Sequence, residues 1–229
     1  MIKSAYQTIK SHDFSLDERR YQFGLREIYT LKNLIDWYYP DSIKKFLQDN
    51  TTNNQAQILD IGCADKYLRR PIEEELNSNY VGIDYSDCNI ENEKLPFADN
   101  TFDMIICLSL IEHISDPTLF MEEIKRVGNS ECLIYLLTPN WRFCVRDFFD
   151  DPTHVRPYSD KSLSMLLRLS GFRSIKVFPS LRCKPKFYYE NPFRFQIANM
   201  IPFLNIKNKF LPSVLKGKAR GVIAIALNK

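Results

Sequence analysis

Two apolar segments of this chain end in residues that could hold a nucleoside. The segment AQILDIGCADKYLRR at 56–70 breaks at Asp60-Ile61-Gly62, and YVGIDYS at 80–86 is a second apolar run that ends at Asp84. A glycine after a buried strand lets the backbone approach a ligand closely, and a carboxylate accepts well from the two vicinal hydroxyls of a ribose. The two segments therefore predict a pocket for an adenosyl group and, with it, group transfer from a nucleoside cofactor.

Two later segments place further polar residues at the same expected edge. ENEKLPFADNTFD at 91–103 begins with Glu91 and Asn92, which suit an adenine amino group and a ring nitrogen, and Ser109 follows the next apolar run. In open α/β sheets, ligands bind beyond the carboxyl ends of the strands. We therefore expect these residues to line one crevice with Gly62 and Asp84.

The elements that must position these residues alternate in type along the chain. Near-continuous apolar runs separated by helical segments are typical of a mostly parallel sheet with both faces covered. The last two runs are expected to pair antiparallel at one edge. Strands are predicted at 57–61, 80–83, 102–110, 132–138, 174–178 and 221–227, and helices at 67–76, 118–127 and 160–169.

The chain divides into four predicted parts. Residues 1–50 form an N-terminal helical appendage, 51–180 the cofactor-binding domain, 181–220 a basic aromatic insertion and 221–229 the final strand. Only ten residues separate Asp84 from Leu95, too few for the helix of a parallel crossover. Either a short strand near 89–91 or a loop stands there, and the N-terminal helices or a partner would cover the sheet face left open.

These motifs resemble the class I S-adenosylmethionine-dependent methyltransferases, in the branch with LPF-x-D-x-x-FD and EH-x-x-DP signatures. The matching strings are LPFADNTFD at 95–103 and EHISDP at 112–117. The resemblance implies an α/β Rossmann-like fold, with a mostly parallel seven-stranded sheet, an antiparallel edge strand and N-terminal helices. It also implies S-adenosyl-L-methionine as the cofactor.

The resemblance assigns cofactor contacts to named positions. The methionine part would lie at Asp60, Gly62 and Ala64, the ribose at Asp84, the adenine near Glu91 and Asn92, and the sulfonium opposite Ser109. Cys63 and Tyr85, the neighbours of Gly62 and Asp84, complete the predicted set. The family pattern D-x-G-x-G-x-G is altered here, because Ala64 and Lys66 stand at its second and third glycines.

The acceptor side is predicted in the polar segment 138–159, which resembles the D-P-x-H-x-R-x-Y string of the same branch. His154 is the candidate base for a hydroxyl acceptor, Arg156 could hold an anionic group, and Tyr158 could orient the acceptor. The alternative is that His154 and Arg156 only tie the loop to the body of the protein. We interpret His113 as a structural histidine beneath the loop.

Composition bears on metal sites, disulfides, the location of the protein and its charged surface. The six cysteines form no CxxC pair, so we expect neither a metal site nor disulfides, and the absence of an apolar leader favours a cytoplasmic protein. Residues 181–220 hold nine Lys or Arg against the single acid Glu190. This segment could cover the pocket, contact an anionic membrane surface peripherally, or bind a phosphate-bearing chain.

The sequence therefore predicts a methyltransferase that acts on oxygen of a small-molecule, saccharide or lipid-linked acceptor. The alternatives are an RNA methyltransferase and a non-catalytic binding module that retains the fold. Nucleic acid is the less favoured partner, because the Asn-Pro-Pro-Tyr-like string of base-flipping enzymes is missing and TPNW at 138–141 differs from it. The oligomeric state is not predicted.

Overall fold

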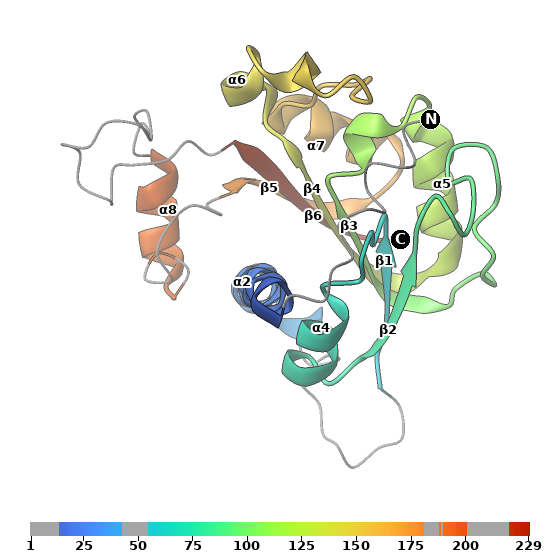
Figure 1. Ribbon diagram of the computed structural model, residues 1–229, viewed down its shortest axis with the longest axis horizontal. Helices are drawn as coiled ribbons and strands as arrows, with labels where there is room; N and C mark the ends of the chain where they lie inside the picture. Colours follow the sequence, from blue (N-terminus) through green and yellow to red (C-terminus); the bar gives the residue numbers. More distant parts are fainter. Residues whose placement is uncertain (1–13, 43–54, 181–187, 189, 201–219) are drawn as a thin grey trace.

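The computed structural model describes residues 14–42, 55–180, 188, 190–200 and 220–229. Within these residues the chain forms one six-stranded sheet of order β2-β1-β3-β4-β6-β5 (Figure 1). The predicted count of seven strands is wrong for this described part. β6 pairs antiparallel with β4 and with β5, so the last two strands pair as predicted, and the other pairings are parallel. The strands are β1 Gln57–Ile61, β2 Asn79–Ile83, β3 Phe102–Leu108, β4 Gly128–Pro139, β5 Arg173–Ser180 and β6 Gly221–Leu227.

A loop replaces the missing strand between β2 and β3. It is fixed to helix α5 (Pro117–Val127), whose Arg126 guanidinium donates to the carbonyl oxygens of Leu95 and Phe97 at 2.9 and 2.8 Å. The Glu123 carboxylate of the same helix accepts from the backbone N–H of Leu95 at 2.9 Å. These contacts satisfy backbone groups that a strand would have paired within the sheet.

Helices cover both faces of the sheet. Figure 1 shows α2 (Phe14–Tyr38) and α4 (Arg69–Glu75) on one side, and α5 and α7 (Asp160–Leu169) on the other. Successive strand residues point to opposite faces, so each strand contributes to two cores. In β4, Leu133 and Tyr135 pack on the α2 side, whereas Ile134 and Leu136 pack on the α5 side. The N-terminal helix therefore covers the face that the sequence left open.

Side-chain caps begin the two helices of the α5 side. The Asp116 carboxylate accepts from the N–H groups of Thr118 and Leu119, and Pro117 occupies the first turn, where no N–H is needed. Ser159 forms a capping box with Ser162 at the start of α7. The predicted helix at 160–169 is confirmed.

The remaining elements lie around the carboxyl ends of the strands or beyond β5. They are the short helices η1 (Ile111–His113), α6 (Trp141–Cys144) and η2 (Phe148–Asp150), and the helix α8 (Pro192–Met200). Most of the basic aromatic insertion 181–220 lies outside the described residues, so its predicted role stays a prediction. Among the helices that the structure describes, none has the length and apolar character needed to cross a membrane.

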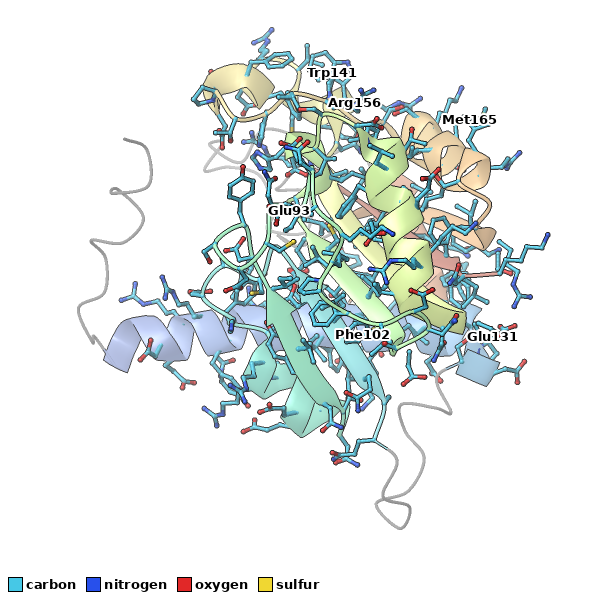
Figure 2. The ribbon with its side chains drawn as sticks, turned by 90° about the vertical axis from the view of Figure 1, so that its right-hand side faces the viewer. Glu93, Phe102, Glu131, Trp141, Arg156 and Met165 are labelled. Carbon is cyan, nitrogen blue, oxygen red and sulfur yellow. The ribbon has the colours of Figure 1, made fainter. Side chains whose placement is uncertain are left out.

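Figure 2 separates the two ends of the sheet. Trp141 and Arg156 lie at the end where β3 and β4 finish, whereas Phe102, the first residue of β3, and Glu131 lie at the opposite end. Chain order reverses at β1, because β2 lies on one side of it and β3 on the other. At such a switch point open α/β sheets bind ligands beyond the carboxyl ends of the strands, and this place, at the ends of β1 and β3, is the candidate crevice.

Candidate active site

The crevice begins with Gly62, the first residue after β1. Its N–H donates to the Ile83 carbonyl oxygen at 2.8 Å, and its φ of +78° is one that glycine adopts without strain. A Cβ added here would meet the Leu110 side chain at 3.2 Å, which follows β3. The absent side chain therefore lets the Leu110 side chain pack closely against the loop after β1.

The loop after Gly62 follows a glycine-like path with other residues. Ala64 and Lys66 have φ of +46° and +58°, the left-handed region that costs an L-residue about 1–2 kcal/mol. Both residues are exposed. The two replacements of the glycine pattern therefore keep the backbone turn, at some cost in stability.

Asp60 supports this loop from below. Its side chain is 2% exposed and accepts a hydrogen bond from the Tyr80 hydroxyl at 2.8 Å. Burial raises the pKa of the Asp60 carboxyl to about 7, against the lowering effect of the Tyr80 hydrogen bond. Cys63 is also buried, and burial raises the pKa of its thiol to about 11. Both side chains are buried, so Asp60 supports the loop through its hydrogen bond with Tyr80 and Cys63 through packing, and their predicted cofactor contacts stay predictions.

The opposite wall of the crevice is the turn after β2. Asp84 is partly exposed; its Oδ1 accepts from the Tyr85 N–H at 2.8 Å, and its own N–H donates to Asp87 Oδ2 at 3.0 Å. Tyr85 is 53% exposed. The turn therefore holds the Asp84 carboxylate at the carboxyl end of β2.

The predicted adenine residues are only partly available. Glu91 Oε1 accepts from the Ser115 N–H at 2.7 Å, which ties the loop after β2 to the segment after β3. Asn92 is exposed, and Ser109 is exposed with a φ of +54°. Of these three, Asn92 and Ser109 have side chains in contact with solvent, and Glu91 holds the loop in place.

A second group of polar residues meets beside η1. One potential ligand atom each of Glu112, His113 and His154 lies within 4.8 Å of the others. Glu112 is 1% exposed, and its Oε2 accepts from the Thr138 hydroxyl at 2.9 Å. Its Oε1 is buried without a hydrogen-bond partner among the described residues, and burial raises the pKa of the carboxyl.

Both imidazole rings are held by backbone carbonyls. His154 Nδ1 lies 2.6 Å from the Phe148 oxygen, and His113 Nδ1 lies 3.1 Å from the Thr153 oxygen. A carbonyl oxygen only accepts, so each Nδ1 carries a hydrogen, and in the neutral ring Nε2 is then the nitrogen with the lone pair. The ring centroids are 4.7 Å apart.

Arg156 contacts η1 and Tyr158 is buried, and their predicted roles toward the acceptor stay predictions. The Arg156 guanidinium donates to the Ser115 carbonyl at 3.0 Å, and its N–H donates to the Glu112 carbonyl at 3.0 Å. Tyr158 is 3% exposed, and its hydroxyl has no partner among the described residues. Arg156 therefore ties the acceptor loop to η1, and Tyr158 lies below the surface.

Comparison with known families shows to which family the chain belongs. Residues 35–177 match the family model described as "Methyltransferase domain". The chain belongs to this family. S-adenosylmethionine is accordingly its cofactor, and the acidic turn after β2 and the open loop after β1 lie where a nucleoside and an amino acid can bind.

The curated relatives of this methyltransferase are distant. A ubiquinone biosynthesis O-methyltransferase of Bartonella tribocorum is 26% identical over 116 residues, 40% of this chain and 47% of that protein. One from Rhizobium etli is 28% identical over 103 residues, 37% and 41% of the two chains. The chain thus spans about half the length of the curated relatives it matches.

Solved structures share the fold of this methyltransferase. A SAM-dependent methyltransferase of Archaeoglobus fulgidus aligns with a TM-score of 0.53 at 18% identity, covering 86% of this chain and 94% of that one. The plantazolicin methyltransferase BpumL in complex with SAH aligns with a TM-score of 0.54 at 13% identity, covering 96% and 91%. At these identities the likeness shows the fold alone.

The residues of this methyltransferase fit the cofactor at both walls of the crevice. Gly62 has no side chain to hinder a close approach of the backbone to a ligand, and the Asp84 carboxylate can accept from ribose hydroxyls. The structure brings Gly62, Asp84 and Ser109 to one edge of the sheet. The sequence prediction missed Glu112, although the EH pair at 112–113 was the available signal.

Asp84 is expected to carry much of the cofactor affinity. Asp84→Ala should weaken binding of S-adenosylhomocysteine by roughly 10²-fold, because hydrogen bonds to a charged acceptor contribute about 1.5–3 kcal/mol each. Isothermal titration calorimetry measures this change.

The matched control removes an acid outside the loops that follow β1 and β2. Asp36→Ala deletes an exposed carboxylate of α2, and it should leave the affinity unchanged. An Asp84→Ala variant that bound the cofactor normally would place the ribose elsewhere.

Proposed function

We propose that this protein transfers the methyl group of S-adenosylmethionine to a hydroxyl oxygen of an anionic acceptor, a small molecule or a lipid-linked saccharide. The observation that supports this proposal is the group Glu112, His113 and His154, at the same end of the sheet as Ser109. An acceptor hydroxyl needs a group that receives its proton, and His154 Nε2 has a lone pair available. The curated relatives named as O-methyltransferases support oxygen as the methylated atom.

The reaction is a direct displacement. The acceptor oxygen forms a bond to the methyl carbon while the carbon–sulfur bond breaks, and the electron pair of that bond remains on sulfur. The proton of the hydroxyl goes to the lone pair of His154 Nε2. The protein contributes mainly by aligning donor and acceptor and by excluding water.

An arginine-lined pocket supports an anionic acceptor. A cavity of about 280 Å³ is lined by Arg142, Phe143, Val145, Arg146, Asp147 and Arg220. Arg220 pairs with Asp147, and Arg142 lies 3.5 Å from Asp160, whereas Arg146 is in no ion pair among the described residues. Phe143 and Val145 are 44% and 53% exposed, so the pocket offers apolar surface next to positive charge.

The pocket is continuous with the segment that holds His154. Its wall, residues 142–147, leads directly into Phe148, whose carbonyl accepts from His154 and whose ring lies 4.5 Å from the imidazole. An acceptor with its anionic group among the arginines would have to span from this wall to the imidazole to place a hydroxyl at His154. A lipid-linked saccharide phosphate has both the charge and the apolar part that this surface suits.

The experiment is methyl transfer from labelled S-adenosylmethionine. We expect label in phosphorylated or lipid-linked saccharides that have a free hydroxyl, and none in the same compounds with that hydroxyl blocked as a methyl ether. Label in an amine or in RNA, with none in any hydroxyl compound, would contradict the proposal.

A substitution in the arginine pocket can be tested in the same methyl-transfer assay. Arg146→Glu should raise KM for the anionic acceptor by roughly 10-fold or more, because a like charge replaces an attractive one. The exposed Arg168 of α7 provides the control, and Arg168→Glu should leave KM unchanged. An equal effect of the two substitutions would assign the change to overall charge.

A further inference from the structure

We propose that Glu112, His113 and His154 bind one divalent transition-metal cation, which receives the acceptor oxygen. The inference rests on the proposed function for the identity of that oxygen, but the cation site itself does not depend on it. Two imidazoles and one carboxylate suit Zn²⁺, Mn²⁺ or Co²⁺ better than Mg²⁺ or Ca²⁺, which prefer oxygen ligands. This site was not expected from the sequence, which predicted no metal.

The first support is the buried carboxylate. Glu112 is 1% exposed, with Oε2 held by Thr138 and Oε1 unpartnered among the described residues. A buried polar atom without a partner costs about 1–3 kcal/mol. A cation at Oε1 would remove that cost. Thr138 would then act as the outer partner that holds the ligating carboxylate in place.

The second support is the orientation of the two rings. Metal-binding histidines almost always donate their other ring N–H to a carbonyl or a carboxylate. Both rings do so here, since each Nδ1 meets a backbone oxygen, from Phe148 for His154 and from Thr153 for His113. Each Nε2 is thus the nitrogen with a lone pair for a cation.

The third support is the spacing. The three potential ligand atoms lie within 4.8 Å of one another, whereas two ligands of one tetrahedral zinc ion lie about 3.4 Å apart. The three atoms would therefore have to approach one another by at most about 1.4 Å when an ion binds. Three protein ligands leave one or more positions open, as in catalytic metal sites.

A bound cation would change how the acceptor loses its proton. Glu112, His113 and His154 would hold the cation, which would act as a Lewis acid that lowers the pKa of a hydroxyl bound to it, and the hydroxyl proton would go to water. The bonds formed and broken at the methyl carbon would be those described above. With the cation bound, His154 Nε2 would be a ligand, so the proton transfer to His154 Nε2 described above applies to the protein without the cation.

Cobalt binding tests the site without any methyl acceptor. After treatment with a chelator and dialysis, the protein should bind one Co²⁺ per chain with a visible absorption band typical of nitrogen and oxygen ligands. Glu112→Gln and His113→Ala should weaken that binding by about 10- to 100-fold or more. Glu122→Gln makes the same change at an exposed position of α5 and should bind Co²⁺ normally.

Unchanged S-adenosylhomocysteine affinity in each variant verifies that the chain has folded. Absence of the absorption band, or equal Co²⁺ binding in Glu112→Gln and the parent, would overturn the cation site. Full methyl transfer by the metal-stripped protein would remove the cation from the reaction and leave the proposed function standing. A cation that binds while no hydroxyl compound is methylated would support the site and contradict the proposed function.

Discussion

Replacing His154 with alanine is expected to lower turnover by roughly 10²- to 10⁴-fold, the usual contribution of a group that handles a proton. The side chain is 14% exposed, its Nδ1–H is fixed by the Phe148 carbonyl, and its Nε2 lies 3.8 Å from Asp151 Oδ2. The loss is expected whether the imidazole takes the proton or holds a cation. Single-turnover transfer of labelled methyl to the hydroxyl acceptor measures it.

Measuring cofactor affinity distinguishes a role of His154 in the reaction from a role in holding the structure. His154→Ala should bind S-adenosylhomocysteine with the affinity of the parent, because Gly62 and Asp84 come from other strand ends. His154→Gln supplies a matched change, since an amide can still donate to a carbonyl but is not a base. Its methyl transfer should be as slow as that of the alanine variant. Its midpoint of urea unfolding should equal that of the parent. Full turnover in His154→Ala would remove His154 from the reaction.

Much of the fold could be predicted because apolar periodicity reports burial directly. The runs at 57–61 and 221–227 and the helix at 160–169 have the predicted bounds. Their central residues are buried on both faces of the sheet or along one side of the helix, which is what produces the pattern in the sequence. The start of β4 at Gly128 was missed, since its first residues, 128–131, are polar or glycine.

The number of strands could not be predicted from local pattern. The segment after Asp84 is held by Arg126 and Glu123, some 30 residues farther along the chain. Whether it pairs as a strand depends on those distant groups and not on its own residues. The choice between a short strand and a loop was therefore left open, and the structure has the loop.

Some residues of the candidate site could likewise be predicted from the sequence, and others could not. Gly62, Asp84 and Ser109 could be predicted because carboxyl ends of parallel strands share one edge of a sheet. The inward position of Glu112 depends on the turn at Ser109, a non-glycine residue with a φ of +54°, and on the Thr138 hydroxyl of β4. No local pattern specifies either feature, so the carboxylate at the centre of the second cluster was missed.

Asp60 is expected to make the stability of the protein depend on pH. Burial raises the pKa of its carboxyl from 3.8 to about 7 in the folded state, while the unfolded chain keeps the ordinary value. Below about pH 4 the group is protonated in both states, so it adds no cost. As the pH rises toward 7, the unfolded state releases the proton first, and the folded state loses stability until about pH 7.

Asp60→Asn should remove this dependence. The amide oxygen can accept from Tyr80 as the carboxylate does, and it carries no charge to bury. The gap between 3.8 and about 7 corresponds to roughly 4 kcal/mol, an upper bound on the stability that the variant gains over the parent between pH 4 and pH 8. Urea denaturation at pH 4.5, 6 and 8 measures the difference.

The surroundings of Asp60 determine how large the effect becomes. The Asp84 and Asp65 carboxylates raise its pKa further, and the Tyr80 hydroxyl lowers it, but desolvation is the largest contribution.

Asp36→Asn, at an exposed position of α2, removes the same charge without burial, and its stability difference from the parent should not follow pH in this way. If the Asp60→Asn difference also stayed constant from pH 4.5 to 8, the buried carboxyl would be ionised across that range. Tyr80 and the loop after β1 would then have to stabilise a buried charge, and the role of Asp60 would change from a neutral support to an anionic one.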